Sequence, residues 1–221
     1  MANKVLELKN VTASYKEGKE VKEVLTDISF SIYEGEIVGL LGESGSGKTT
    51  LCKCILKLLK EYQGEVKHYT GNPQMIFQDP FGSLNPKKKI GWILEEPLKV
   101  SGDSKWSKAK RGKRVEEILS LVNLSPEFYN RYPRELSGGQ RQRVSIALAL
   151  ITGTKLILAD EPLSALDVTV QTQIIELLKT LQREKGISIL FVSHDVDVVA
   201  DLCERVLLIE EGKLREVKLN K

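Results

Sequence analysis

The sequence has few cysteines, little net charge and no long apolar run, and each absence excludes a class of protein. Its 221 residues include three cysteines, too few and wrongly spaced for a disulfide framework or a zinc site. A formal net charge of +3 does not point to nucleic acid or an anionic membrane as partner. The most apolar stretch, residues 146–159, is broken by polar residues and falls short of a membrane span.

The beginning of the chain also lacks a basic segment followed by an apolar one, so we expect no secretory signal. Cys52 and Cys54 stand two apart in a predicted helix and point to different faces. They therefore cannot hold one metal ion, and we predict that they are core thiols. These features predict a protein of a reducing cytoplasm, whose role at a membrane would depend on a partner.

Strand and helix patterns alternate along the chain and predict a parallel α/β core. Residues 5–15 and 24–33 have strand patterns, and Ile37–Leu41 is an all-apolar run suited to a strand buried on both faces. Another strand pattern begins after Gly64 and ends near Phe77. Between the strand at residues 37–41 and the strand pattern after Gly64 lies a predicted helix. One side of it is apolar, formed by Leu51, Ile55, Leu58 and Leu59.

The second half begins with a polar, proline-rich and mainly helical block, from residue 80 to about 133. Strand patterns return at residues 155–160 and 187–193, with an amphipathic helix between them. The end of the chain predicts a hairpin that turns at Glu211-Gly212. We therefore expect a helical subdomain inserted on one side of the α/β core.

A phosphate-binding loop pattern, G-x-x-x-x-G-K-[ST], follows the buried strand and opens the first helix, which is the context this motif requires. Its backbone N–H groups can surround a β-phosphate, Lys48 can reach the β and γ oxygens, and Thr49 can bind Mg²⁺. Kinases, GTPases and helicases share this loop. The predicted nucleotide-binding residues here are Gly42, Glu43, Ser44, Gly45, Ser46, Gly47, Lys48, Thr49 and Thr50.

Two adjacent carboxylates end the predicted strand at residues 156–160. Parallel strands present their C-terminal ends to the ligand, so Asp160 and Glu161 should face the phosphate loop. Asp160 is the expected Mg²⁺ partner, through water. Glu161, one residue on, can orient or deprotonate the attacking water.

The motif that decides the class is Leu136-Ser137-Gly138-Gly139-Gln140, which precedes an amphipathic helix. Ser137 can cap this helix, and the glycines leave its first N–H groups open to a second anion. These residues resemble the signature motif of the ABC ATPases, and the resemblance covers essentially the whole chain. In that family the signature of one subunit completes the ATP site of another, so two ATP molecules lie between two subunits.

The resemblance implies roles for further residues. Tyr15 would stack on adenine, Gln78 would reach Mg²⁺ and the attacking water, and His194 would contact the γ-phosphate. The implied groups are a catalytic set of Glu161, His194, Gln78 and Lys48, a metal site of Thr49, Gln78 and Asp160, and a site acting in trans of Leu136, Ser137, Gly138, Gly139, Gln140 and Asp167. No catalytic position departs from the family pattern, so we expect a subunit competent for hydrolysis.

The resemblance also implies a single ABC ATPase domain over residues 1–221. It would comprise a P-loop core with a parallel sheet, an N-terminal antiparallel β subdomain, and an inserted helical subdomain at about residues 80–150 that carries the signature. ATP and Mg²⁺ would be its cofactors. The implied partners are a second ATPase subunit, identical or sister, two transmembrane permease subunits and, indirectly, an extracytoplasmic solute-binding protein, with no nucleic acid. The chain would lie peripherally on the cytoplasmic face of the membrane.

Residues 78–86, QDPFGSLNP, resemble those of importers of dipeptides, oligopeptides and nickel or metal–chelate complexes. Peptide-importing members often carry a C-terminal extension, and the end of this chain favours the nickel side weakly. One alternative is the ABC-type subunit of the carbon–phosphorus lyase complex. An ATPase of chromosome maintenance is disfavoured because long coiled coils are missing, and we interpret residues 105–114 with Trp106 as a solvated helix face. A nucleotide kinase would leave the signature unexplained.

Overall fold

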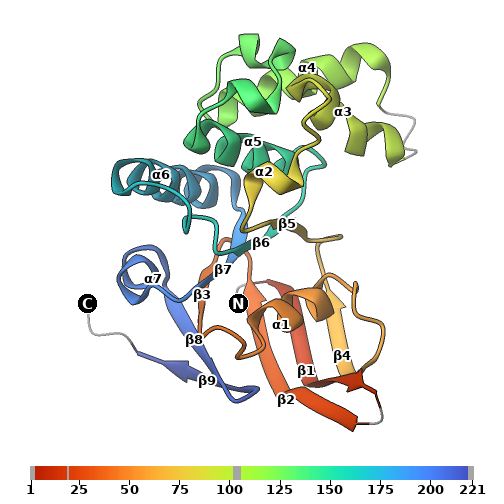
Figure 1. Ribbon diagram of the computed structural model, residues 1–221, viewed down its shortest axis with the longest axis vertical. Coiled ribbons are helices and arrows are strands. Elements are labelled where there is room, and N and C mark those ends of the chain that lie inside the picture. The colour runs from red at the N-terminus through yellow and green to blue at the C-terminus, as the bar shows by residue number, and fades with distance from the viewer. Residues whose placement is uncertain (1–2, 19, 102–105, 219–221) are drawn as a thin grey trace. The chain divides into compact units, whose positions relative to one another are not determined.

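The computed structural model describes residues 3–18, 20–101 and 106–218. The chain divides into two compact units. The first comprises residues 1–75, 155–161 and 179–221, and the second comprises residues 76–154 and 162–178. Strands dominate the first unit and helices dominate the second (Figure 1).

An antiparallel sheet of three strands opens the first unit: β1 (Lys4–Glu17), β2 (Glu20–Tyr33) and β4 (Tyr62–His68), in the order β2-β1-β4. Alternate residues of β2 are buried, with Ile28 and Ile32 completely shielded from solvent. This period of two is what a strand covered on one face requires. The predicted N-terminal antiparallel subdomain is therefore confirmed.

A second sheet has the strand order β5-β6-β7-β3-β8-β9. Strands β3, β6, β7 and β8 are parallel, and β9 returns antiparallel to β8 in the predicted hairpin. Every residue of β3, β6 and β7 is buried, as expected of parallel strands covered on both faces. The strands span Ile37–Leu41 (β3), Gln74–Ile76 (β5), Leu156–Asp160 (β6), Ser188–Ser193 (β7), Arg205–Glu210 (β8) and Lys213–Val217 (β9).

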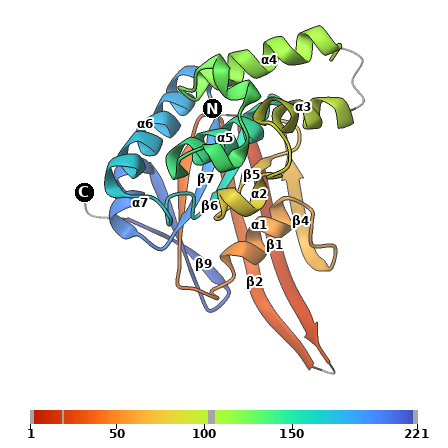
Figure 2. The same cartoon turned by 45° about the horizontal axis from the view of Figure 1, so that its top comes forward.

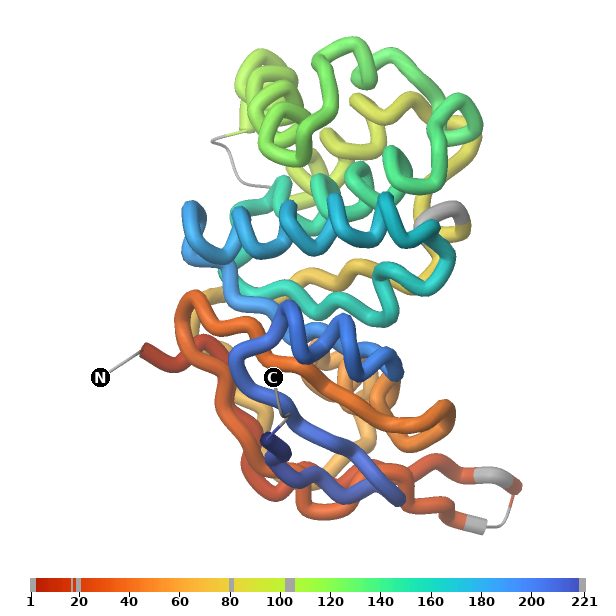
Figure 3. The backbone as a smooth tube through the Cα atoms, turned by 90° about the vertical axis from the view of Figure 1, so that its left-hand side faces the viewer, coloured from red at the N-terminus to blue at the C-terminus, as the bar shows by residue number. Residues whose placement is uncertain are grey.

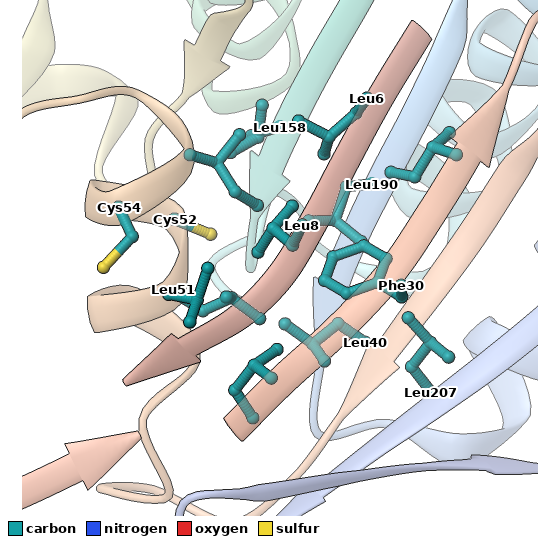
Figure 4. Close-up of a cluster of buried hydrophobic side chains, with 14 of the residues drawn as sticks. Leu6, Leu8, Phe30, Leu40, Leu51, Cys52, Cys54, Leu158, Leu190 and Leu207 are labelled. Atoms are coloured by element: carbon teal, nitrogen blue, oxygen red, sulfur yellow. The ribbon is translucent and has the colours of Figure 1, made fainter. Parts of the chain in front are cut away.

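The main core of the first unit lies among the two sheets and α1 (Lys48–Ile55) (Figure 4). Leu8 from the antiparallel sheet and Leu40 and Leu190 from the parallel sheet contribute buried side chains to it. Burying a leucine stabilises a fold by about 1.5–3 kcal/mol. Cys52 and Cys54 also belong to this cluster, and burial raises the pKa of the Cys54 thiol to about 11. The prediction of core thiols is confirmed.

Two element boundaries differ from the prediction. Helix α1 ends at Ile55, and Leu58, expected on its apolar side, is 66% exposed. The residue after the C-cap, Lys57, has a positive φ of 57°, which the helix cannot continue through. The strand pattern after Gly64 is in fact two strands in different sheets, β4 and β5, and β4 contains Gly64 at a φ of 88°.

The second unit is built from short helices, and α3, α4 and α5 pack together in it (Figure 2). Helix α6 (Val168–Lys185) begins in the second unit and ends in the first, which also holds α7 (Val196–Leu202). None of the helices within the described ranges has the length and apolarity that a bilayer crossing demands. The other elements are α2 (Pro80–Ser83), α3 (Ile90–Val100), α4 (Lys108–Leu121), α5 (Gly138–Leu150) and the 3₁₀ turns Pro126–Asn130 and Pro133–Glu135.

A buried carboxylate ties α3 to the segment that follows α4. Glu95 accepts a hydrogen bond of 2.5 Å from the Tyr129 hydroxyl and lies 3.0 Å from the Lys99 ammonium. The hydrogen bond to this carboxylate raises the pKa of Tyr129 to about 12. Tyr129 is thereby held with its ring against Gly91, where an added Cβ would lie 2.5 Å from a ring carbon.

Two glycines in helices of this unit should respond oppositely to alanine. Gly112→Ala in α4, where a Cβ would meet nothing within 4 Å, should stabilise the chain by about 0.5–1 kcal/mol through helix propensity. Gly91→Ala should destabilise it by about 1–3 kcal/mol, because the held Tyr129 ring must move. Urea unfolding followed by circular dichroism measures both, and a stabilising Gly91→Ala would contradict the described packing.

Candidate functional site

The shape of the phosphate loop depends on its packing against β2 and β8. Gly47, just before α1, has a φ of 109°, and a Cβ there would lie 2.8 Å from Cδ2 of Leu25 and 3.0 Å from the Val24 carbonyl oxygen. A Cβ on Gly42 would lie 2.6 Å from the carbonyl oxygen of Ile209. Sequence reasoning did not single out Val24, Leu25 and Ile209, since apolar strand residues carry no sign of this role.

The β8–β9 hairpin is fixed to β2 beside the loop. The backbone N–H of Thr26 donates to the Gly212 carbonyl at 2.8 Å. Figure 3 shows the hairpin lying along β2. A Cβ on Gly212 would lie 2.6 Å from the Val24 carbonyl oxygen, so the hairpin turn approaches β2 at the strand residue that also limits Gly47.

Lys48 is buried inside its own loop. Its ammonium donates to the carbonyl oxygens of Gly42 at 2.7 Å and Glu43 at 2.8 Å. An ammonium has three donors, so one remains for a ligand oxygen. The loop carbonyls therefore hold the charge in position.

Ser46 supplies a second indication of an anion site. Its hydroxyl oxygen is buried and has no hydrogen-bond partner within the described part of the chain. A buried polar group left without a partner costs about 1–3 kcal/mol. A phosphate oxygen bound in the loop can accept from this hydroxyl, so the residues present fit the predicted nucleotide phosphates.

Asp160, the last residue of β6, lies beside the start of α1. The Thr49 hydroxyl donates to its carboxylate at 3.4 Å. Burial and the neighbouring charge of Glu161 raise the pKa of Asp160, and the Thr49 hydrogen bond and Lys48 oppose this rise. A bound cation would stabilise the ionised carboxylate. This donor set fits Mg²⁺, which takes one or two protein ligands together with phosphate and water.

Glu161 and His194 form a pair at the same edge of the sheet. Glu161 has a φ of 45°, and its backbone N–H donates to the Val192 carbonyl of β7 at 2.9 Å. Its carboxylate lies 3.1 Å from Nδ1 of His194, which follows β7 directly. A non-glycine residue in the left-handed region costs on the order of 1 kcal/mol or more, and such strain persists where neighbours enforce it.

Tyr15 completes the arrangement of the first unit. It lies half-buried on β1, and its hydroxyl is 3.4 Å from the Thr50 hydroxyl of α1. The loop and His194 also border an open cavity of about 910 Å³. The first unit thus brings together the predicted residues Tyr15, Gly42–Thr50, Asp160, Glu161 and His194.

The remaining predicted residues lie in the second unit. Ser137 caps α5: its hydroxyl accepts from the Gln140 N–H at 3.3 Å, and the Gln140 side chain accepts from the Ser137 N–H at 3.0 Å. Asp167 caps α6 by accepting from the Val170 N–H at 3.0 Å. A Cβ on Gly139 would lie 2.6 Å from Val170, so these two helix starts pack together.

Leu136, just before the cap, is buried, and Gly138 lies near Leu166. Gln78 is exposed between β5 and α2. The signature residues, Asp167 and Gln78 all belong to the second unit, and the phosphate loop belongs to the first. The functional roles of all these residues stay predictions.

Residues 25–164 match the family described as ABC transporter. The chain is 43% identical to the oligopeptide transport ATP-binding protein OppF of Streptococcus mutans, over 97% of this chain and 74% of that protein. It is 40% identical to the dipeptide transport ATP-binding protein DppF of Lactococcus lactis, with the same coverage.

Among solved structures, the dimeric ABC transporter cassette MJ0796 is similar over 98% of this chain and 99% of its own, with a TM-score of 0.83 and 37% identity. A post-hydrolysis form of that cassette, bound to ADP and phosphate, is 36% identical with the same TM-score. These similarities confirm the predicted α/β fold class.

The unpartnered hydroxyl of Ser46 gives a test of the loop. Ser46→Ala should leave the nucleotide-free chain as stable as before or slightly more stable, because a buried orphan group is removed. The same change should weaken ATP binding by about tenfold. Ser44→Ala, at an exposed serine of the same loop, is the control for stability. Urea unfolding and calorimetric titration measure the two effects, and a marked loss of stability in Ser46→Ala would contradict the account.

Proposed function

Because the chain belongs to the ABC transporter family and is one of its ATPases, with ATP and Mg²⁺ as cofactors, we propose that it powers the import of peptides through membrane subunits. The family predicted from the phosphate loop and the signature is thereby confirmed. The single observation that supports peptides as the cargo is the 43% identity to an oligopeptide transport ATP-binding protein over nearly the whole chain.

Peptides are favoured over nickel and metal chelates as the cargo. The relatives named for oligopeptide and dipeptide transport cover 97% of the chain. Residues 78–86, which suggested this branch, are compatible with both cargoes. We therefore place peptide import first. The nickel or metal-chelate cargo, and the carbon–phosphorus lyase subunit, become alternative results of the test below.

In the proposed mechanism the first unit binds the nucleotide. Lys48 offers its remaining donor to the β and γ phosphate oxygens, and the loop N–H groups and Ser46 surround the phosphates. Tyr15 stacks on the adenine, with little selectivity for the base. Thr49, Asp160 and Gln78 would hold Mg²⁺, which when bound neutralises charge on the phosphates.

Hydrolysis needs a base beside the γ-phosphate. We assign this role to Glu161, whose strained backbone and contact with His194 fix the carboxylate at the edge of the sheet. Glu161 deprotonates or orients the attacking water. His194 orients Glu161 and contacts the γ-phosphate.

The site is completed by a second subunit, identical or sister. The signature helix α5 is capped by Ser137, and its first N–H groups can receive the γ-phosphate bound by the partner. Asp167, which caps α6 beside it, would lie at the same contact. The dimeric state of the similar cassette MJ0796 supports this arrangement. ATP then stabilises the closed pair of subunits, because its γ-phosphate contacts both of them. Hydrolysis removes this contact, and the pair opens.

The energy is passed on to partners in the membrane. We place the contact with two transmembrane permease subunits at the segment around Gln78, between β5 and α2. An extracytoplasmic solute-binding protein would deliver the cargo to those subunits. In this proposal the chain lies at the cytoplasmic face of the membrane, and residues from about 80 to 150 form the helical subdomain that carries the signature.

Glu161→Gln should retain ATP binding and lose turnover by about 10²–10⁴-fold, because the amide cannot take up a proton from water. Glu184→Gln, an exposed position on α6, is the matched control and should behave as the unmodified chain. Phosphate release and ATP titration measure the two steps. Near-normal turnover in Glu161→Gln would show that another group is the base.

The cargo is tested in cells that carry Lys48→Ala in place of the unmodified chain. Peptide import should fall to background, because the loop loses the charge that reaches the β and γ phosphates. Uptake of labelled oligopeptides and of ⁶³Ni²⁺ should be measured in parallel. Loss of nickel uptake with peptide uptake intact would reverse the assignment. Failure to copurify with integral membrane subunits would favour the carbon–phosphorus lyase alternative.

A further inference from the structure

The start of α4 carries an unusual charge pattern. Its first acidic residue is Glu116, in the third turn. The N-terminus of a helix is the positive end of its dipole, so cations there are unfavourable, as are like charges three or four residues apart. An anion bound at this end would reverse the effect. The cations in residues 108–114 are Lys108, Lys110, Arg111, Lys113 and Arg114.

The same turns line a cavity of about 520 Å³ in the second unit. Trp106 and Ile151 supply its apolar wall, and three cations and one carboxylate supply its charge. Helix α4 lies at the periphery of this unit (Figures 2 and 3). The lining residues are Trp106, Lys110, Lys113, Arg114, Glu117, Ile151, Thr152 and Gly153.

The arginine of this cavity has a structural task. Arg114 donates to the carbonyl oxygens of Ile151 at 3.2 Å and Leu150 at 3.3 Å, where α5 ends. It also lies 3.6 Å from the Glu117 carboxylate. Arg114 therefore closes the end of α5, and most of its donors are committed.

The two lysines differ from this arginine. Lys110 and Lys113 are exposed, and neither has an ion partner within the ranges that the structure describes. A lysine ammonium is a point charge on a flexible stem, which attracts anions without selecting their geometry. The available positive charge of the cavity therefore lies on two exposed lysines, and Trp106 lines the same cavity.

The exposure of the two lysines and the concave shape of the site favour one class of anionic partner over the others. Small-metabolite sites place a few polar groups in buried, fixed positions, and both lysines here are exposed. Proteins that bind single-stranded nucleic acid use a long basic groove, and a flat membrane surface cannot enter a cavity. A protruding peptide can enter, with carboxylates on either side of an apolar residue.

We propose that this cavity docks an acidic segment of a partner protein. Carboxylates of the segment pair with Lys110 and Lys113, and an apolar side chain between them packs on Trp106 and Ile151. The segment around Trp106, interpreted from sequence as a solvated helix face, thus acquires a binding role. Lys105, part of that interpretation, lies outside the described residues. The proposal is independent of the nucleotide site and of the cargo.

The chain has two tryptophans, so Trp92→Phe leaves Trp106 as the only indole reporter. We would titrate this full-length variant with a peptide of four glutamates around one phenylalanine, and with its glutamine counterpart. The acidic peptide should shift Trp106 emission saturably, should bind more weakly as salt rises, and should bind at least about tenfold tighter than the glutamine peptide.

Lys110→Glu with Lys113→Glu should weaken peptide binding by at least about tenfold. Lys87→Glu with Lys89→Glu, a charge reversal of equal size at exposed positions before α3, should leave binding unchanged. ATP turnover should be the same in both.

Several results would overturn the proposal. They are equal binding of the glutamine peptide and equal loss of peptide binding in the two double variants. Tighter binding to phosphatidylserine vesicles than to the peptide would assign the cavity to a membrane. Tighter binding to a single-stranded oligonucleotide would assign it to nucleic acid.

Discussion

The close packing of the phosphate loop against β2 and β8 is the constraint on which the rest of the site depends. Gly42 and Gly47 have no room for a side chain, because the backbone of Val24 and Ile209 and the side chain of Leu25 occupy the space. This packing therefore restricts the shape of the loop. Within it, the Lys48 ammonium is already bound to two loop carbonyls and keeps one donor for phosphate.

Two carboxylates, Asp160 and Glu161, belong to the same unit as this loop. Asp160 and Glu161 end one strand together, and the pKa of Asp160 is raised by burial and by its neighbour. The protein thus keeps two carboxylates close together at the place where the proposed mechanism needs Mg²⁺ and an attacking water. The Glu161–His194 contact separates their tasks, since it turns Glu161 toward the end of β7 while Asp160 meets Thr49.

Sequence reasoning succeeded where chemistry requires particular residues at fixed spacing. The phosphate loop, the paired carboxylates and the capped signature helix all follow from such patterns, and so does the family. It failed where tertiary packing decides: α1 ends three residues before Leu58, and one strand pattern contains β4 and β5 of different sheets. The residues that shape the loop, Leu25 and Ile209, gave no signal, because their apolar character equally suits any strand.

The cavity beside α4 was predicted from the sequence only in part. Its cations were visible in the sequence, but the sequence could not show that Trp106 and the end of α5 form a concave wall with them. Arg114 also binds α5 carbonyls from another helix, which no local pattern predicts. Only the fold distinguishes lysines that line a cavity from lysines that merely face solvent.

The central claim, that each nucleotide is shared between two subunits, can be measured with mixed pairs. Lys48→Ala destroys the loop half of the site, and Ser137→Arg blocks the signature half, so each variant alone should hydrolyse no ATP. Co-expressed, they should recover up to about a quarter of normal turnover, since half of random dimers are mixed and each has one of two sites intact. A co-expressed mixture of Lys48→Ala and Glu161→Gln subunits should stay inactive, because both changes lie in the same half of the site. A Lys48→Ala and Ser137→Arg mixture that forms dimers and remains inactive would contradict the shared site.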